Sequence, residues 1–393
     1  MADTTDYVHA GPGTLMGAVL RRFWQPVAVT DKFALGSARP VRILNEDLTV
    51  YLGETGTPHV VAFRCAHRGT QLSTGWVEGD CIRCFYHGWK YDGSGQCVEM
   101  PAEDPSFPPK VKIKSYPAQI YAGVIFAYLG EGEPPPLPHF AELDRDFGVK
   151  WTEQKVWPCN WFQRLENALD SAHLAFVHSG SEFGGMVTAA PPRFEHRETE
   201  WGMELKAIRS ADNIRINELH FPNIIHIRTP VLTRVADRLP WSDLINWYVP
   251  VDDETSVLFS SRSAPLVGEQ AREFEERLPP HRYYNPADQH EALFANPRLA
   301  DDPSFAADPV SAQDYVAQLG QARIADRSQE RLGKTDAGII LMRSLFRREM
   351  DAVQRGVPGK QWQPKTDTRP LPVPPGVPDL PVVAVSVQGR LGP

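Results

Sequence analysis

The sequence predicts an α+β protein, in which a small antiparallel β domain precedes a larger domain with an antiparallel sheet and helices. Between residues 41 and 128, short β-rich runs are broken by Gly, Asp and Pro. Beyond residue 151, longer alternating runs are interleaved with segments of helical period. Proline contributes 36 of the 393 residues, about twice its usual share. This proline content favours loops and edge strands over a helical bundle.

Length and charge narrow the class of protein. A chain of 393 residues is long for one hydrophobic core and suits two domains. The hydrophobic share of 42% and the charged share of 23% are typical of globular proteins. The formal net charge of −8 argues against a nucleic-acid-binding surface, although a local basic patch could still serve a small acidic substrate.

The sequence also indicates a cellular compartment. It has no run of about eighteen apolar residues, so we expect no membrane span and no membrane partner. The first six residues lack the basic and apolar regions of a signal peptide. Five cysteines are an odd and small number for this length, which makes a disulfide framework unexpected. We therefore predict a cytoplasmic protein.

The first part of the chain divides into a lead-in over residues 1–37 and a β domain over residues 38–150. The lead-in contains a short amphipathic helix at 15–24 that ends at Pro26. The expected strands of the β domain include residues 41–44, 48–52, 60–63 and 122–129. The Gly- and Pro-rich residues 130–138 predict a stiff connector, which we take as the domain boundary.

The second domain is expected over residues 151–358, with a Pro-rich tail over 359–393. Its alternating runs predict an antiparallel sheet with one covered face, and they span residues 194–209, 214–229, 244–251 and 255–263. Residues 265–310 are polar and predict a long surface excursion. Helical period returns from Ser311, and Thr335-Asp336 predicts the N-cap of a helix that ends near Gly356.

Two Cys–His pairs stand out in the first domain. Cys65-Ala-His67 and Cys84-Phe-Tyr-His87 each offer one thiolate and one imidazole, a set that can hold either zinc or an iron–sulfur cluster. A zinc finger usually separates its first ligands by two to four residues, whereas only Ala66 lies between Cys65 and His67. Gly69 and Gly88 let the backbone wrap closely around an inorganic core. The other cysteines, Cys81, Cys97 and Cys159, are expected to be buried small hydrophobic residues.

A second group begins the larger domain. Residues 167–178 bring together Asn167, Asp170, His173 and His178. Two imidazoles and one carboxylate on one side of a metal form the facial triad of non-heme Fe(II) oxygenases, although paired histidines on an amphipathic helix are more often structural. On an unbroken helix, residues five apart point about 140° away from each other. The helix must therefore kink, bulge or end between His173 and His178 if both bind one metal.

Both groups resemble one family. Cys65-Ala-His-Arg-Gly-Thr and Cys84-Phe-Tyr-His-Gly-Trp-Lys-Tyr-Asp resemble the Rieske [2Fe–2S] signature of Rieske non-heme iron oxygenases, and residues 167–178 resemble the mononuclear-iron motif of that family. Further matches at residues 20–26, 128–138, 247–254 and 326–336 point to the phthalate-dioxygenase-like branch. The resemblance covers residues 15 to about 358. It implies a Rieske domain followed by a helix-grip-type catalytic domain.

The resemblance also implies the metal ligands. Cys65 and Cys84 would bind one cluster iron, and His67 and His87 the other. His173 and His178 would bind a mononuclear Fe(II). The third ligand in the family is an acidic residue far downstream at the start of a helix, which matches Asp314. Asp326 and Asp336 are the alternatives, although each could be an ordinary helix cap.

Two polar residues beside these histidines have implied roles of their own. In the family, the residue that matches Asp170 hydrogen-bonds a cluster histidine of a neighbouring subunit and bridges the electron path. Asn167 would lie near the mononuclear iron. A bridge between subunits implies a homotrimer or a dimer of trimers.

The implied function is that of a terminal oxygenase component. It would use O2 and electrons from a separate NAD(P)H-dependent reductase with flavin and a plant-type [2Fe–2S] ferredoxin domain, because the chain has no Gly-rich nucleotide-binding fingerprint. The expected substrate is an aromatic compound carrying a carboxylate, oxidised by ring hydroxylation or oxidative O-demethylation. Arg209, Arg215 and Arg228 are candidate carboxylate anchors. The alternative is a Rieske-type electron carrier or a zinc-stabilised binding protein without oxygenase activity.

Overall fold

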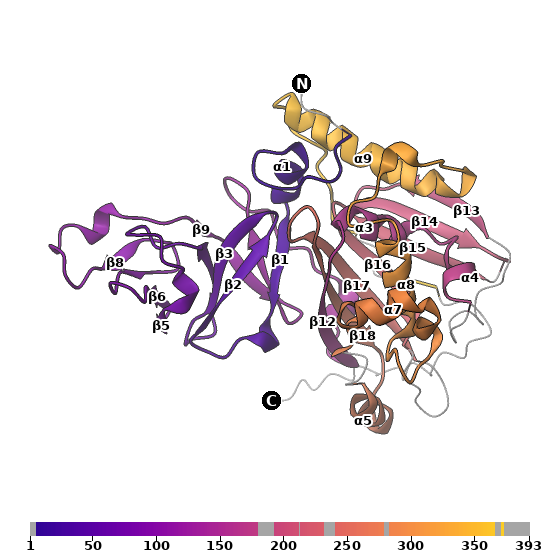
Figure 1. Ribbon diagram of the computed structural model, residues 1–393, viewed down its shortest axis with the longest axis horizontal. Coiled ribbons are helices and arrows are strands. Elements are labelled where there is room, and N and C mark those ends of the chain that lie inside the picture. The colour runs from indigo at the N-terminus through magenta and orange to yellow at the C-terminus, as the bar shows by residue number, and fades with distance from the viewer. Residues whose placement is uncertain are drawn as a thin grey trace, which may run out of the picture.

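The computed structural model describes residues 5–179, 192–211, 213–231, 240–278, 283–365 and 371–372. Small sheets occupy one end of the molecule, and a large sheet with the longer helices occupies the other (Figure 1). Within the described residues this is the predicted α+β architecture, with antiparallel pairing throughout.

Three small antiparallel sheets make up the first part of the chain, with strand orders β1-β11-β10, β2-β3-β4-β9 and β5-β6-β7-β8. Their strands are β1 (Trp24–Val29), β2 (Ser37–Ile43), β3 (Glu46–Leu52), β4 (Pro58–Ala62), β5 (Trp76–Glu78), β6 (Cys81–Arg83), β7 (Lys90–Tyr91), β8 (Cys97–Glu99), β9 (Ser115–Tyr116), β10 (Ala118–Tyr121) and β11 (Val124–Tyr128). The β5–β8 sheet lies at the far end of the molecule from the large sheet (Figure 1).

The first helix is shorter than predicted. Helix α1 (Leu15–Arg21) begins at an N-cap where Thr14 Oγ1 accepts from the Gly17 N–H. The expected helix over residues 15–24 is therefore wrong at its end, because Trp24 and Pro26 belong to β1. Strand β1 is an edge strand, where proline is tolerated; Pro26 pairs with Phe126 of β11, and the register shifts directly after it.

A seven-stranded antiparallel sheet dominates the second part, in the order β12-β18-β17-β16-β15-β14-β13. Its strands are β12 (Val149–Trp157), β13 (Arg193–Glu198), β14 (Gly202–Ile208), β15 (Ile214–His220), β16 (Ile224–Pro230), β17 (Trp241–Pro250) and β18 (Ser256–Ala264). The predicted runs at 194–209 and 214–229 each form a hairpin of the expected antiparallel sheet, because residues 199–201 and 221–223 turn the chain back.

Helices cover this sheet. Helix α3 (Trp161–Leu169) starts at Asn160, whose Oδ1 accepts from the Phe162 N–H, and it packs against β15 and β17. Helix α9 (Ala337–Gln354) crosses above α1 and β13 (Figure 1). The predicted cap at Thr335-Asp336 and the end near Gly356 are confirmed, since α9 follows Asp336 and Gly356 has a positive φ of 65°.

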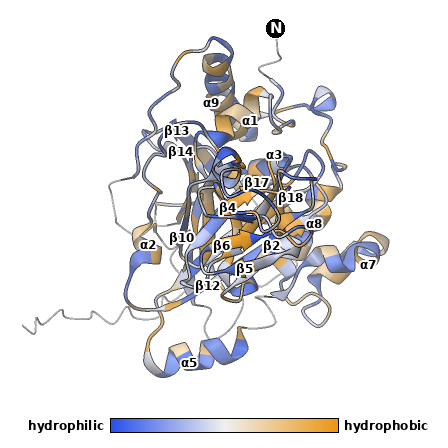
Figure 2. Ribbon diagram, turned by 90° about the vertical axis from the view of Figure 1, so that its left-hand side faces the viewer, coloured by the Kyte–Doolittle hydropathy of each residue, from blue (hydrophilic) through white to orange (hydrophobic). Residues whose placement is uncertain are grey.

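The predicted surface excursion over 265–310 is only partly correct. Helix α5 (Gly268–Arg277) lies at the periphery and is mainly hydrophilic (Figure 2). Residues beyond it instead form helix α7 (His290–Ala295) and bury Leu293, Ala300 and Ala306 against Trp157. These few apolar residues are separated in the sequence by polar ones, so the sequence pattern does not predict the small hydrophobic core that they form.

The extended tail predicted for 359–393 lies mostly outside the described residues. Where it is described, Gln363 N–H donates to the Glu200 carbonyl and the Lys365 ammonium reaches Glu218. In the parts of the chain that the structure describes, no helix combines the length and apolar character needed to cross a membrane.

Candidate metal centres

A break in the helical path precedes the two predicted iron-binding histidines. Helix α3 ends at Leu169, and Asp170 adopts an extended conformation while its Oδ1 accepts from the Ala172 N–H at 2.7 Å. His173 then starts the one-turn helix α4 (Leu174–Val177), and His178 follows its end. Because α4 ends at Val177, a helix end lies between the two histidines, as predicted for residues five apart that face one point.

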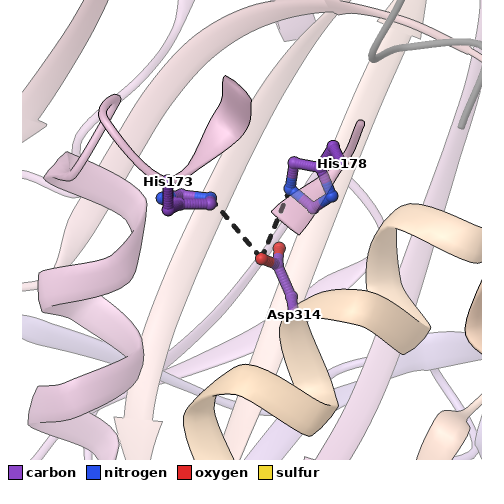
Figure 3. A group of neighbouring side chains, drawn as sticks. All are labelled: His173, His178 and Asp314. Atoms are coloured by element: carbon purple, nitrogen blue, oxygen red, sulfur yellow. Dashed lines mark ion pairs between the residues drawn. The ribbon is translucent and has the colours of Figure 1, made fainter. Parts of the chain in front are cut away.

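Asp314 completes the group. It lies on helix α8 (Pro309–Leu319), which begins at Asp308, where Oδ1 accepts from the Ser311 N–H. Asp314 Oδ1 is 3.5 Å from His173 Nε2 and 3.4 Å from His178 Nε2 (Figure 3). Asp314 is in the second turn of α8, so the expected position at the helix start is displaced by one turn.

These residues fit a divalent metal such as Fe(II). One carboxylate oxygen and two imidazole nitrogens lie within 4.8 Å of one another, and their spacing is that of neighbouring ligands in one coordination sphere. Among the described residues, no Lys or Arg forms an ion pair with Asp314, and Arg164 and Arg215 act on its charge only from a longer distance. The set of donors is the 2-His-1-carboxylate type.

The protonation of the group follows from its contacts. Burial disfavours the charged carboxylate of Asp314, but His178, His173 and Asn167 outweigh it and lower the pKa. Burial likewise disfavours an imidazolium at His178, yet the Asp314 carboxylate outweighs it and raises the pKa of that histidine. A metal at this site would therefore displace the proton that Asp314 favours on His178.

The two other predicted residues also lie at this group. Asn167 Nδ2 donates to Asp314 Oδ1 at 3.3 Å. Asp170 Oδ2 is 3.6 Å from His173 Nδ1. Burial raises the pKa of Asp170, but contact with His173 and with the backbone N–H groups of Ala172 and His173 outweighs burial, and the pKa is lowered.

The two alternative acidic residues are placed as caps. Asp326 Oδ1 accepts from the Ser328 N–H at the start of a short 3-10 helix. Asp336 precedes α9 and accepts from the Gly333 N–H. The structure thus brings Asp314 to the histidines, and places Asp326 and Asp336 in ordinary capping contacts.

The two predicted cluster loops share one backbone pattern. In each loop the Cys N–H donates to a carbonyl five residues on, and its carbonyl accepts from a glycine N–H four residues on. The bonds are Cys65 N to Thr70 O, Gly69 N to Cys65 O, Cys84 N to Trp89 O and Gly88 N to Cys84 O. Gly69 and Gly88 have φ of 76° and 73°, which L side chains rarely adopt.

The four side chains of these loops fit a cluster with a buried and an exposed end. Cys65 and Cys84 are buried, whereas His87 is exposed. The rings of His67 and His87 have centroids 4.5 Å apart, and His67 Nδ1 is buried with no hydrogen-bond partner. A buried imidazole nitrogen without a partner is the condition expected of an atom that binds a metal.

Sequence reasoning missed several contacts. Tyr91 OH is 3.2 Å from Cys65 Sγ, and Trp89 stacks on His67 at 4.5 Å between centroids. Gln313 Oε1 is 2.8 Å from His178 Nδ1. Tyr91 and Trp89 follow the second loop directly, so their proximity was available from the motif. Gln313 lies 135 residues from His178, and no local pattern signals that contact.

The remaining cysteines are largely as predicted. Cys97 and Cys159 are buried, but Cys81 is partly exposed, because it begins the short strand β6 beside a turn. All five cysteines are free.

A cavity of about 180 Å³ opens beside the mononuclear group, between the large sheet and helices α3, α4 and α8. Of the three candidate anchors, Arg215 lines this cavity and is buried, which lowers its pKa to about 10. Arg228 points to the other face of the sheet, where its Nε is 3.9 Å from Asp243 Oδ1. Arg209 is not among the lining residues.

Comparison with known proteins identifies the class. Residues 23–117 match the family described as the Rieske [2Fe-2S] domain. The chain is 31% identical over 365 residues to the 5,5'-dehydrodivanillate O-demethylase oxygenase subunit of Sphingobium sp. (strain NBRC 103272 / SYK-6), covering 88% of this chain and 80% of that protein. It therefore belongs to the Rieske non-heme iron oxygenases, whose cofactors are a Rieske cluster and a mononuclear non-heme iron.

Two further relatives refine this placement. The phthalate 4,5-dioxygenase oxygenase subunit of Pseudomonas putida is 29% identical over 381 residues, 87% of this chain and 84% of that protein. The structure of Pseudomonas putida CBB5 NdmB matches with a TM-score of 0.65 and 22% identity, covering 86% and 93% of the two chains, and it supports the fold. The chain is thus an oxygenase component of the phthalate-dioxygenase-like branch, a mono- or dioxygenase. Because the similarity spans the catalytic domain, the electron-carrier alternative is not favoured.

Proposed function

We propose that this oxygenase oxidises an anionic aromatic compound the size of a single ring. The reaction would take place at a metal held by His173, His178 and Asp314. The charge of the cavity carries this proposal. Its described charged lining residues are Glu153, Lys155, Arg164, Asp170, Arg215, Arg262, Asp308 and Asp314. Four cations balance four carboxylates, so a divalent metal adds net positive charge, which favours a carboxylate-bearing substrate.

The volume of the cavity and the apolar residues that line it support an aromatic substrate. A cavity of about 150 Å³ is known to admit benzene, and this cavity measures about 180 Å³. Its apolar lining includes Leu174, Ile227, Leu244 and Leu258. The relatives named above act as an O-demethylase and a dioxygenase, so both ring hydroxylation and oxidative O-demethylation remain within the proposal.

The roles of the residues follow from their contacts. When bound, the cluster would supply one-electron transfer and the mononuclear iron would supply O2 chemistry. Cys65, His67, Cys84 and His87 would hold the cluster. His173, His178 and Asp314 would occupy one side of the iron, Asn167 would orient Asp314, and Arg215 would anchor the substrate carboxylate.

The partner proposal rests on where the two centres lie. The cluster loops, next to β6, and the helix α4, which carries the iron-binding histidines, lie at opposite ends of one chain (Figure 1). A neighbouring subunit would bring its cluster to Asp170, whose side chain is 32% exposed. This supports a homotrimer or a dimer of trimers, fed by a reductase with flavin and a plant-type [2Fe–2S] ferredoxin domain. The cytoplasmic location stays a prediction.

A substrate screen tests the function. With a matched reductase, benzoates, phthalates and methoxybenzoates should be consumed faster than their neutral amides. Release of formaldehyde would identify O-demethylation, and a hydroxylated ring would identify ring oxidation. In Arg215→Gln, KM should rise for the acid and change little for the amide. Equal turnover of acids and amides would contradict an anionic substrate.

The site and the assembly have separate tests. His173→Ala should keep the visible spectrum of the cluster and lose turnover; turnover that persists would exclude His173 as an iron ligand. Co-expressed Cys84→Ser and His173→Ala chains should regain part of the activity, because one subunit supplies the cluster and its neighbour the iron. Inactive mixtures and a fully active monomer would contradict the trimer.

A further inference from the structure

Gln313 is the buried residue that precedes Asp314 on helix α8, with a relative exposure of 6%. Its Oε1 lies 2.8 Å from His178 Nδ1, and its Nε2 donates to Asp301 Oδ1 at 2.7 Å. Asp301 belongs to the 3-10 helix Pro297–Asp301, so three separate segments meet in this chain of contacts. His178 itself is 1% exposed.

The chain of contacts has one consistent direction of donation. A carboxylate only accepts, so the amide NH2 of Gln313 must face Asp301 and its oxygen must face His178. An amide oxygen also only accepts, so His178 Nδ1 must carry the proton. In the neutral ring Nε2 then keeps its lone pair, and Nε2 is the nitrogen that faces Asp314 at 3.4 Å.

We propose that Gln313 is a positioning residue, which fixes the tautomer and ring orientation of His178 so that Nε2 is presented to the metal. Asp301 acts one step further out by preventing the Gln313 amide from rotating. This inference rests on the proposed mononuclear site. A hydrogen-bonding partner on the free nitrogen of a ligand histidine is a general requirement for orienting such ligands.

The two ligand histidines are thereby held in different ways. His173 Nδ1 faces the carboxylate of Asp170 at 3.6 Å, whereas His178 Nδ1 faces a neutral amide at 2.8 Å. A carboxylate partner increases the basicity of a ligand histidine more than an amide does. Asp170 is also partly exposed, whereas Gln313 and His178 are both buried.

Cobalt(II) binding to the full-length protein tests the proposal without relying on turnover. The mononuclear metal is removed with a chelator, the visible spectrum of the cluster confirms that the first domain is intact, and Co(II) is titrated while metal bound per chain is measured. Gln313→Met has a similar length and lacks the amide oxygen. It should weaken Co(II) binding by about 10- to 100-fold, and Gln321→Leu, which changes an exposed glutamine beyond α8, should not.

An exchange variant separates positioning from packing. Asp301→Asn/Gln313→Glu reverses the amide and the carboxylate, so a side-chain oxygen still faces His178 and an amide still donates to residue 313. It should restore Co(II) affinity to within about threefold of the unchanged protein. Equal affinity in Gln313→Met, or an exchange variant no better than Gln313→Met, would overturn the role of Gln313. If His178→Ala kept the Co(II) affinity of the unchanged protein, the assignment of the metal site itself would be wrong.

Discussion

Two groups with the same geometry lie on opposite sides of the large sheet. In the cavity, Asp314 Oδ1 is 3.5 and 3.4 Å from the Nε2 atoms of His173 and His178. On the other face, Glu218 Oε2 is 3.4 Å from both His220 Nε2 and His226 Nδ1. Distances between donor atoms therefore do not distinguish a metal site from an internal ion pair.

The surroundings of the two groups differ in charge. The Lys365 ammonium lies 2.8 Å from Glu218 Oε1, and His226 Nε2 is 3.8 Å from Asp243. Asp243 is in turn 3.0 Å from the Arg145 guanidinium. Asp314 contacts only neutral amides and imidazoles among the described residues. The protein balances the Glu218 group with cations in direct contact, whereas Arg164 and Arg215 act on Asp314 without an ion pair and the proposed metal would supply the balancing charge.

The largest expected difference is in metal content. Asp314→Asn should lower the affinity for the mononuclear metal by about 100-fold or more, because it removes the proposed carboxylate ligand. Glu218→Gln should leave metal content unchanged. Metal analysis of both purified variants makes the comparison, and equal losses of iron would show that the two groups are not distinct.

Glu218→Gln should instead destabilise the fold. Removing one member of a buried ion pair leaves the other charge uncompensated, which costs about 3 kcal/mol. Urea unfolding measures the loss, with the exposed Glu195→Gln as the control. Glu218→Gln/Lys365→Met should recover part of the stability, because it removes the orphaned cation. A double variant no more stable than Glu218→Gln would contradict charge balance as the cause.

The Glu218 group should also make stability fall at alkaline pH. Burial opposes a charge on His226, but Asp243 and Glu218 outweigh it and raise its pKa to about 9. Because the pKa of His226 is higher in the folded than in the unfolded state, the protonated histidine stabilises the fold. This stabilisation is complete below the unfolded pKa of about 6.5 and is lost as pH rises through 9. The loss should be of the order of 1 to 3 kcal/mol. Thermal unfolding from pH 6.5 to 9.5 measures it, and His226→Gln should show a flatter profile.

The smallest effect concerns proton release at the metal site. The raised pKa of His178 means that metal and proton compete for this histidine. Affinity for Co(II) should therefore weaken as pH falls, by up to about tenfold per unit for one displaced proton. Calorimetry in two buffers of different ionisation enthalpy counts the proton. A binding constant independent of pH between 5.5 and 7 would contradict this competition.

Short-range sequence patterns predicted most of the candidate metal-binding residues. The Cys–His pairs are encoded within a few residues, and the five-residue spacing of His173 and His178 predicts a helix end between them, which is the end of α4 at Val177. Asp314 is different, because only the resemblance to a family pointed to a residue so far along the chain. No sequence pattern predicted a role for Gln313, since its contact with His178 depends on how α8 packs against α4.

The sequence also did not predict which face of the sheet each strand residue occupies. Arg215 and Arg228 lie on neighbouring strands with similar alternation, yet one faces the cavity and the other faces Asp243. A turn whose residues continue the alternation gives no signal that the register has changed. The turns at 199–201 and 221–223 are examples, because the alternating run around each of them contains two strands.

The distance in sequence between His178 and its partners on α8 has a consequence for folding. A metal shared by these segments closes a loop of more than 130 residues, since Gln313 alone is 135 residues from His178. In the chain-entropy model, a covalent link across a loop of about 100 residues restricts the unfolded chain by roughly 4.7 kcal/mol. The iron would then act as a reversible cross-link between α4 and α8, so that loading the metal stabilises the catalytic domain against unfolding.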